Sequence, residues 1–188
     1  MILWPETQPT LIAGDLTLRP WQESDADRIY EICQDPTIQE FTTIPVPYTQ
    51  AHAIGFVATR TEAFSRSESM PFAGVVDGRV VLSISLHNIA LFDHIGELGY
   101  WLAPEARGSG LTSRAVTTLT DYLFTIGFRR LTAQTLPENH GSQKTLTNAG
   151  FHLESVVPQG MTRRDESQTD AMLFVKFPPV DPMSEPAS

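Results

Sequence analysis

The sequence has 188 residues, of which 41% are hydrophobic and 19% charged, and this length and composition fit one domain that buries a core without metals or disulfides. Its formal net charge of −9 argues against broad nucleic-acid binding, because a protein that neutralises phosphates needs a basic face. No apolar run approaches the roughly 20 residues that cross a bilayer, so we expect neither nucleic acid nor membrane as a partner.

The amino terminus and the cysteine content indicate a compartment. The segment MILWPETQPTLIAG lacks the basic start, long apolar stretch and cleavage site of a secretory signal. We therefore expect a cytoplasmic protein. The single cysteine, Cys33, cannot form an internal disulfide, and it shares a helical stripe with Ile29 and Ile32 that favours core packing.

The first predicted elements are a strand and two helices. Residues 16–18 have strand character and lead into a helix start, for which we expect Ser24 as the N-cap. That helix should stop before Asp35. Residues 41–48 contain two prolines and should form a loop bordering a substrate pocket, and residues 51–64 should form the second helix.

A strand period begins at residue 72. Residues 72–76 and 80–86 are two strands separated by Asp77-Gly78, a pair that favours a tight hairpin because both central turn residues need a positive φ. Another strand should follow at residues 97–102.

The second half alternates helices and strands. Leu111, Ala115, Leu119, Leu123 and Ile126 repeat at helical spacing up to Gly127. The elements expected after this helix are a strand at 131–136, a helix at 142–148 and strands at 151–157 and 171–177. The order predicts a mixed α+β fold, with one domain over residues 1–177 and a proline-rich, disordered tail at 178–188. Residues 159–170 are expected to form a loop.

A glycine-rich turn joins the strand at 97–102 to the helix at 111–126. Backbone N–H groups at a helix start lack internal partners, and glycines let a ligand approach closely, so the turn suits a phosphate. It is not a P-loop, because Gly110 is followed by Leu111-Thr112 rather than by Lys and Ser or Thr. A dinucleotide-binding turn would need a third glycine where Ser113 stands. The alternative is a turn that only joins strand to helix.

Several motifs together resemble the GNAT acetyltransferase superfamily. Arg107-x-x-Gly110-x-Thr112 resembles that family's pyrophosphate loop, Arg/Gln-x-x-Gly-x-Gly/Ala, with Thr112 in place of the small residue. Asn139-His-Gly-Ser142, followed by Asn148-Ala-Gly-Phe151, resembles its second CoA-binding stretch. Leu18-Arg-Pro-Trp21, Glu97-Leu-Gly-Tyr-Trp-Leu102 and Asn139-x-x-Ser142 are similar in particular to the RimJ/RimL branch, named for acetylating ribosomal-protein N-termini.

The resemblance implies a GNAT-like fold, a central twisted and mostly antiparallel sheet with a splayed strand pair and flanking helices. It implies an N-acetyltransferase that moves the acetyl group of acetyl-CoA, its co-substrate, to a primary amine by direct attack in a ternary complex. No metal is expected. The residues that the resemblance assigns to CoA are Trp101, Leu102, Arg107, Gly108, Ser109, Gly110, Leu111, Thr112, Asn139 and Ser142.

The chemistry suggests catalytic candidates. An amine must lose a proton before it attacks a thioester, and Glu97 is the first candidate for the base, with a structurally paired strand carboxylate as the alternative. Backbone N–H groups near Tyr100 and Trp101 can hold the oxyanion. Ser142 is the candidate for protonating the thiolate, and Tyr100 is either a rival acid or a packing residue. Asn139 either binds pantetheine or orients the helix, and both Asn139 and Ser142 are also good helix caps.

Other residues carry weaker signals. The five histidines show no metal-ligand spacing. Trp21, Phe41 and Trp101 either line an acceptor pocket or belong to the core. Two other functions on this fold are an acyl-CoA sensor without catalysis and an interaction module. The sequence does not identify the acceptor amine, and we expect a monomer or a homodimer.

Overall fold

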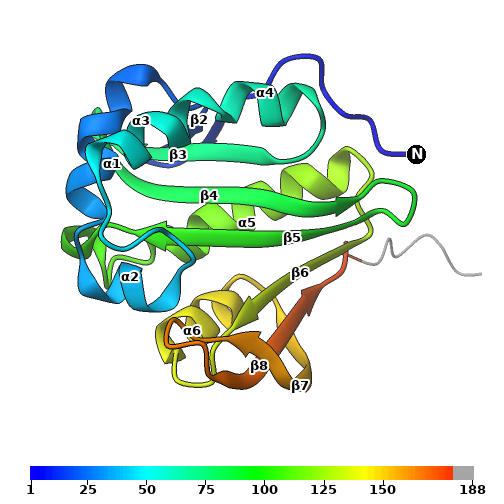
Figure 1. Cartoon of the computed structure of the whole chain (residues 1–188). Helices are drawn as coiled ribbons and strands as arrows, with labels where there is room; N and C mark the ends of the chain where they lie inside the picture. Colours follow the sequence, from blue (N-terminus) through cyan, green and yellow to red (C-terminus); the bar gives the residue numbers. More distant parts are fainter. Residues whose placement is uncertain (180–188) are drawn as a thin grey trace, which may run out of the picture.

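A computed structural model describes residues 1–179 as one eight-stranded sheet with helices on both of its faces (Figure 1). The strands are β1 (Leu11–Ala13), β2 (Leu16–Arg19), β3 (Met70–Val76), β4 (Arg79–Ala90), β5 (Ile95–Leu102), β6 (Arg130–Thr135), β7 (His152–Thr162) and β8 (Gln168–Lys176). The helices are η1 (Glu23–Asp25), α1 (Ala26–Ile32), α2 (Pro36–Phe41), α3 (Gln50–Ala58), α4 (Arg60–Ser65), η2 (Pro104–Ala106), α5 (Leu111–Thr125) and α6 (His140–Asn148). The tail predicted at 178–188 falls outside the described residues from residue 180 onward.

The strand order in the sheet is β1-β2-β3-β4-β5-β6-β8-β7. Neighbouring strands are antiparallel except β5 and β6, which are parallel over just three residue pairs, from Ile95↔Arg130 to Glu97↔Thr132. Beyond Glu97 the two strands separate, and Figure 1 shows β6 turning away from β5. The mixed α+β fold and the splayed strand pair are therefore confirmed.

Hydrophobic periodicity places the core between the sheet and α5. Five consecutive residues of β4, 80–84, are buried together with Leu86, and every third or fourth residue of α5 is buried, as the helix period requires. The side chains of Ile84, Leu86, Leu119 and Leu123 are fully buried. The hairpin between β3 and β4 is also confirmed, since Asp77 and Gly78 have φ of 49° and 74°. Cys33 is buried in the same core.

The start of α1 corrects one prediction. Ser24 lies inside η1 and does not cap the helix. Asp25 stands at the N-cap position, although its side chain makes no capping hydrogen bond to α1. Its buried carboxylate instead accepts the backbone N–H of Gln22 at 2.8 Å and pairs with both terminal nitrogens of Arg19, each at 2.8 Å. The Arg19–Asp25 pair therefore ties the end of β2 to the first helical turn.

Three further segments differ from the predictions. The helix expected at residues 51–64 is two helices, α3 and α4, which meet at Thr59. Helix α2 was not predicted, and Asp35 caps it by accepting the backbone N–H of Ile38 at 3.0 Å. The loop expected at residues 159–170 is mostly strand, because β7 and β8 continue through it to a turn at 163–167. Nearly all of β7 is exposed, so it has no alternating apolar pattern that sequence reasoning can detect.

Across residues 1–179 we find no helix whose length and hydropathy would allow it to cross a membrane.

Candidate active site

A cavity of about 1020 Å³ lies where β5 and β6 separate. Its walls include Glu97 and the rest of β5 on one side and residues 133–135 of β6 on the other. The turn before α5 and the first half of α6 also line it. A gap inside a sheet leaves backbone groups of both strands without ladder partners, and these groups can bind an extended ligand.

Glu97, Gly99 and Trp101 share one face of β5, because side chains alternate along a strand. Glu97 lies opposite His87 of β4, and its Oε2 accepts a hydrogen bond from Asn88 Nδ2 at 3.0 Å. The Glu97 side chain is half-buried at the cavity wall. It is therefore both a paired strand carboxylate and a group that a bound amine can reach.

The opposite face of β5 carries the second pair of candidates. The Tyr100 hydroxyl lies 2.8 Å from Ser142 Oγ of α6, and either oxygen can be the donor. Burial raises the pKa of Tyr100 to about 12, an effect that its hydrogen bond with Ser142 partly offsets. Tyr100 therefore keeps its proton at neutral pH. The backbone N–H of Ser142 donates to Asn139 Oδ1 at 3.1 Å, so Asn139 is the N-cap of α6, whereas the Ser142 hydroxyl is engaged with Tyr100.

The turn before α5 has the geometry of an anion site. Gly108 and Gly110 have φ of 77° and 75°, a left-handed conformation that favours glycine, and a Cβ at either position would meet open space. No side chain caps α5, which leaves the N–H groups of its first turn available. Ser109 differs from its expected role: its hydroxyl donates to the Ala106 carbonyl at 2.6 Å, and the residue does not line the cavity.

Arg107 at the start of this turn is held by a residue far away in the sequence. Its Nη2 lies 2.6 Å from Oδ1 of Asp35, the N-cap of α2. Burial acts to raise the pKa of the Asp35 carboxyl, but hydrogen bonds from Arg107 and from the backbone outweigh burial and lower this pKa. The pair links the turn before α5 to α2, and no sequence signal indicated it.

Aromatic side chains form part of the wall on the Glu97 face. Phe41 lines the cavity, as one interpretation of the sequence suggested. Trp101 also lines it but is only 9% exposed, and Trp21 packs against Trp101 with ring centroids 6.3 Å apart. Trp21 is thus a core residue, and Trp101 is a nearly buried residue of the cavity wall. Arg60 of α4 lines the same side, with its guanidinium 4.4 Å from the centre of the Phe56 ring.

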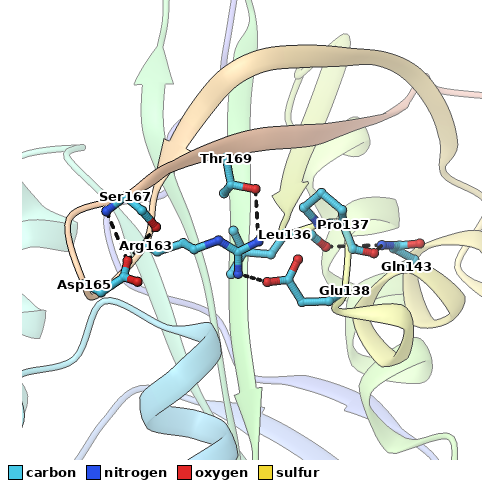
Figure 2. A network of polar contacts seen from close by, with 8 residues as sticks. All are labelled: Leu136, Pro137, Glu138, Gln143, Arg163, Asp165, Ser167 and Thr169. Carbon is cyan, nitrogen blue, oxygen red and sulfur yellow. Dashed lines mark hydrogen bonds and ion pairs between the residues drawn. The ribbon is translucent and has the colours of Figure 1, made fainter.

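The hairpin between β7 and β8 connects two walls of the cavity through consecutive arginines. Arg163 pairs with Glu138, which directly precedes the N-cap of α6, and donates to Thr169 Oγ1 at 3.1 Å (Figure 2). Arg164 donates to the carbonyls of Gln39, Thr42 and Ile44 at distances between 2.6 and 3.1 Å.

The hairpin turn itself is held by Asp165, whose carboxylate accepts from the hydroxyl and the N–H of Ser167 (Figure 2). Behind Glu138, the Gln143 amide donates to the carbonyls of Leu136 and Pro137. These contacts hold the segment before α6 in place.

The structure brings the catalytic candidates Glu97, Tyr100 and Ser142 to one cavity with the predicted CoA residues other than Ser109. Within residues 1–179 no three His, Cys, Asp or Glu side chains are grouped so that they could hold a metal ion.

Comparisons with known proteins agree with this architecture. The sequence model of a family described as "Acetyltransferase (GNAT) domain" matches residues 15–152. An uncharacterized N-acetyltransferase, p20 of Bacillus licheniformis, is 28% identical over 152 residues, which cover 79% of this chain and 85% of that protein.

Two solved structures share the fold. One is Mycobacterium smegmatis RimJ in complex with CoA-disulfide, with a TM-score of 0.81, 23% identity and coverage of 93% of this chain and 88% of that one. The other is RimL, a ribosomal L7/L12 alpha-N-protein acetyltransferase in complex with coenzyme A, with a TM-score of 0.83, 18% identity and coverage of 90% and 98%.

Proposed function

The chain belongs to the GNAT acetyltransferase family, and on that premise we propose that it acetylates a primary amine, either a protein N-terminus or a small amine, by direct attack in a ternary complex. The observation that carries this proposal is the placement of Glu97 and of the Tyr100–Ser142 pair on opposite faces of β5, beside the gap. The amine nitrogen must bond to the thioester carbon and the sulfur must leave it, so the groups that serve the nitrogen and the sulfur have to reach that carbon from different sides, as this arrangement allows.

The residues around the turn would hold acetyl-CoA. The free N–H groups at the start of α5 suit the pyrophosphate, and the open backbone edges of β5 and β6 suit the amide groups of pantetheine. Arg107 adds positive charge near this site, although in this structure it is paired with Asp35. RimL and RimJ, which share the fold, are described as complexes with coenzyme A and with CoA-disulfide.

The proposed steps divide the proton transfers between the two faces. Glu97 accepts a proton from the ammonium, directly or through water, so that the nitrogen lone pair can attack the thioester carbon. Backbone N–H groups of β5 near Tyr100 then hold the oxyanion. As the C–S bond breaks, the Ser142 hydroxyl donates a hydrogen bond to the sulfur, and Tyr100 orients that hydroxyl.

Two observations support the proposed acceptor class. The RimL structure is described as an alpha-N-protein acetyltransferase, which favours the free amino terminus of a polypeptide. The net charge of −9 also suits a cationic acceptor. Such an enzyme would act in the cytoplasm.

A screen for CoA release tests the proposal. Purified protein is mixed with acetyl-CoA and either peptides bearing free amino termini or small polyamines, and free thiol is measured with time. We expect acetyl-CoA alone to raise the unfolding temperature by mass action and at least one amine to release CoA. Stabilisation by acetyl-CoA without transfer to any amine would indicate an acyl-CoA sensor, and no stabilisation would indicate an interaction module.

A further inference from the structure

His87 of β4 is a titratable side chain that lines the cavity but has no part in the steps above. It lies directly across from Glu97 in the β4–β5 register, on the same face of the sheet. A Cβ atom placed at Gly99 would lie only 2.8 Å from Nε2 of His87 and 3.4 Å from its Cδ2. The imidazole therefore occupies the space that a side chain at position 99 would fill.

The direction of this ring distinguishes His87 from Glu97. Pairing between β5 and β6 ends at Glu97, so Gly99 lies in the separated part of β5. The imidazole leans over Gly99, toward the gap. Glu97 instead accepts its hydrogen bond from Asn88, which follows His87 on the side away from Gly99. The imidazole is thus nearer than the carboxylate to the place where the thioester must lie.

The surroundings leave the imidazole available. Neither ring nitrogen hydrogen-bonds to another residue in the described part of the chain, and the side chain is half-buried. The other charged or titratable residues that line the cavity are Glu97 and Tyr100 on β5, Arg60 on α4, Arg107, Glu138, and His140 and Lys144 on α6. Arg107 and Glu138 are in ion pairs, and His140 and Lys144 belong to the helix that meets the opposite face of β5. Glu97 and Arg60 are therefore the charged residues on the same side of the cavity as His87.

We propose that His87, in place of Glu97, removes the proton from the acceptor amine, and that Glu97 is the acidic neighbour that stabilises the resulting imidazolium. This inference rests on the proposed acetyl transfer. Nε2 takes one proton from the bound ammonium and later releases it to water, and the nitrogen lone pair forms the new C–N bond. When the C–S bond breaks, the second nitrogen proton passes through Ser142 to the sulfur. The products are the acetamide, CoA thiol and one proton.

An imidazole suits this task better than a carboxylate. A base works best when it titrates near the working pH, and imidazole ordinarily titrates near pH 6.5, whereas a glutamate carboxyl titrates near 4.3. This proposal also explains why residue 99 is a glycine, since any larger residue would push the His87 ring away from the gap.

The first test replaces His87 by glutamine and follows kcat against pH, using acetyl-CoA and a peptide that the wild-type protein acetylates in the CoA-release screen. We expect kcat to fall about 10²-fold near neutral pH. We also expect the decline of rate at acidic pH to disappear in H87Q but to persist in E97Q. Acetyl-CoA affinity and the unfolding temperature should match the wild type in H87Q.

The matched control is His152→Gln, which changes an exposed histidine of β7 outside the cavity and should behave as wild type. A wild-type rate and pH profile in H87Q would overturn the role of His87 while leaving acetyl transfer intact. Failure of the wild-type protein to acetylate any amine would instead overturn the proposed function itself.

A double-mutant cycle tests the ring's position. In Gly99→Ala the new methyl group must displace the imidazole, so the rate should fall. In a His87→Ala background the same change should cost nothing further, because the ring is already absent. Equal losses in both backgrounds would mean that the methyl group obstructs the substrate by itself, and would contradict the proposed placement of His87.

Discussion

Ser142 and Tyr100 form a pair of hydroxyls in which each residue restricts the other. The Ser142 N–H is satisfied by Asn139, so its hydroxyl is free of capping and is directed to Tyr100. A hydroxyl held by a fixed neighbour loses little freedom when it bonds to a developing thiolate. The pair is therefore suited to act late in the reaction, when charge gathers on sulfur.

Ser142→Ala should lower the rate of acetyl transfer more than it lowers acetyl-CoA affinity. A hydrogen bond to a charged group contributes about 1.5–3 kcal/mol, so the single-turnover rate should fall roughly 10- to 10²-fold, with the Kd for acetyl-CoA nearly unchanged. Ser155→Ala, on exposed β7, is the control. An unchanged transfer rate in S142A, together with earlier unfolding, would reduce Ser142 to a structural residue.

Glu97→Gln retains the size and hydrogen bonding of the side chain but removes its negative charge. We expect a loss on the order of 10²-fold at neutral pH while acetyl-CoA still binds. The loss should shrink as the pH rises toward about 8, where a peptide amino terminus becomes neutral without help. Rates of both forms are measured against pH with one acceptor. Parallel profiles of equal height would remove Glu97 from the mechanism.

At the scale of elements, the Arg107–Asp35 pair makes α2 part of the wall of the CoA site. Asp35→Asn isolates this pair, because asparagine caps a helix about as well as aspartate. The folded-state pKa of Asp35 is lowered, so its contribution to stability is present above the ordinary aspartate value near 3.9 and is lost as the pH falls through the folded-state value.

We therefore expect Asp35→Asn to lower the free energy of unfolding at pH 7 by at most about 1 kcal/mol, the usual range for a partly exposed pair. Urea unfolding at pH 7 and at pH 3 measures this difference, which should be smaller at the lower pH. Asp15→Asn removes a more exposed pair with Arg114 and is the control. A difference that persists unchanged at pH 3 would show that the variant weakens the cap rather than the ion pair.

Local patterns in the sequence predicted most of the elements. The hairpin at Asp77-Gly78, the helix α5 and the strands of the core follow from periods and turn residues that lie within a few positions of one another. Helix α2 is shorter than two turns, and β7 is exposed on both sides, so neither has a period to detect. The prediction of Ser24 as the N-cap was wrong because Asp25 occupies that position. The placement of Asp25 depends on Arg19, which reaches it across the turn.

The candidate site shows the same difference between local patterns, which the sequence reveals, and contacts between distant residues, which it does not. The turn before α5 is contiguous in sequence and could be proposed as a phosphate site from the sequence alone, as Glu97, Tyr100 and Ser142 could be proposed for catalysis. The contacts that position them are not contiguous: Asp35 and Arg107 are 72 positions apart, and Arg164 is 125 positions from Gln39. From the sequence alone, His87 is considered only as a metal ligand, because its place over Gly99 depends on the register of β4 against β5.

On the scale of the whole molecule, Arg164 joins the β7–β8 hairpin to the loop after α2. Arg164→Gln should loosen that loop. Loss of hydrogen bonds to three carbonyls should lower the local opening energy by about 1–2 kcal/mol and speed amide exchange in residues 42–48 roughly 5- to 30-fold. The KM of the acceptor should rise while acetyl-CoA affinity stays constant.

The control is Arg129→Gln, whose exposed side chain makes no ion pair with the described residues. Exchange that accelerates across the whole molecule in R164Q, rather than in this loop, would show that Arg164 supports global stability instead of the wall of the cavity.

The separation of β5 from β6 also has a mechanical consequence. Three residue pairs join the two strands, and the sheet beyond them consists of two halves, with β1 to β5 in one and β6 to β8 in the other (Figure 1). In the proposed mechanism a long cosubstrate lies in the gap, contacts both halves and holds them together while it is bound. In each catalytic cycle acetyl-CoA must then enter the gap and leave it as CoA. The turnover rate therefore cannot exceed the rate at which CoA is released from between the two halves.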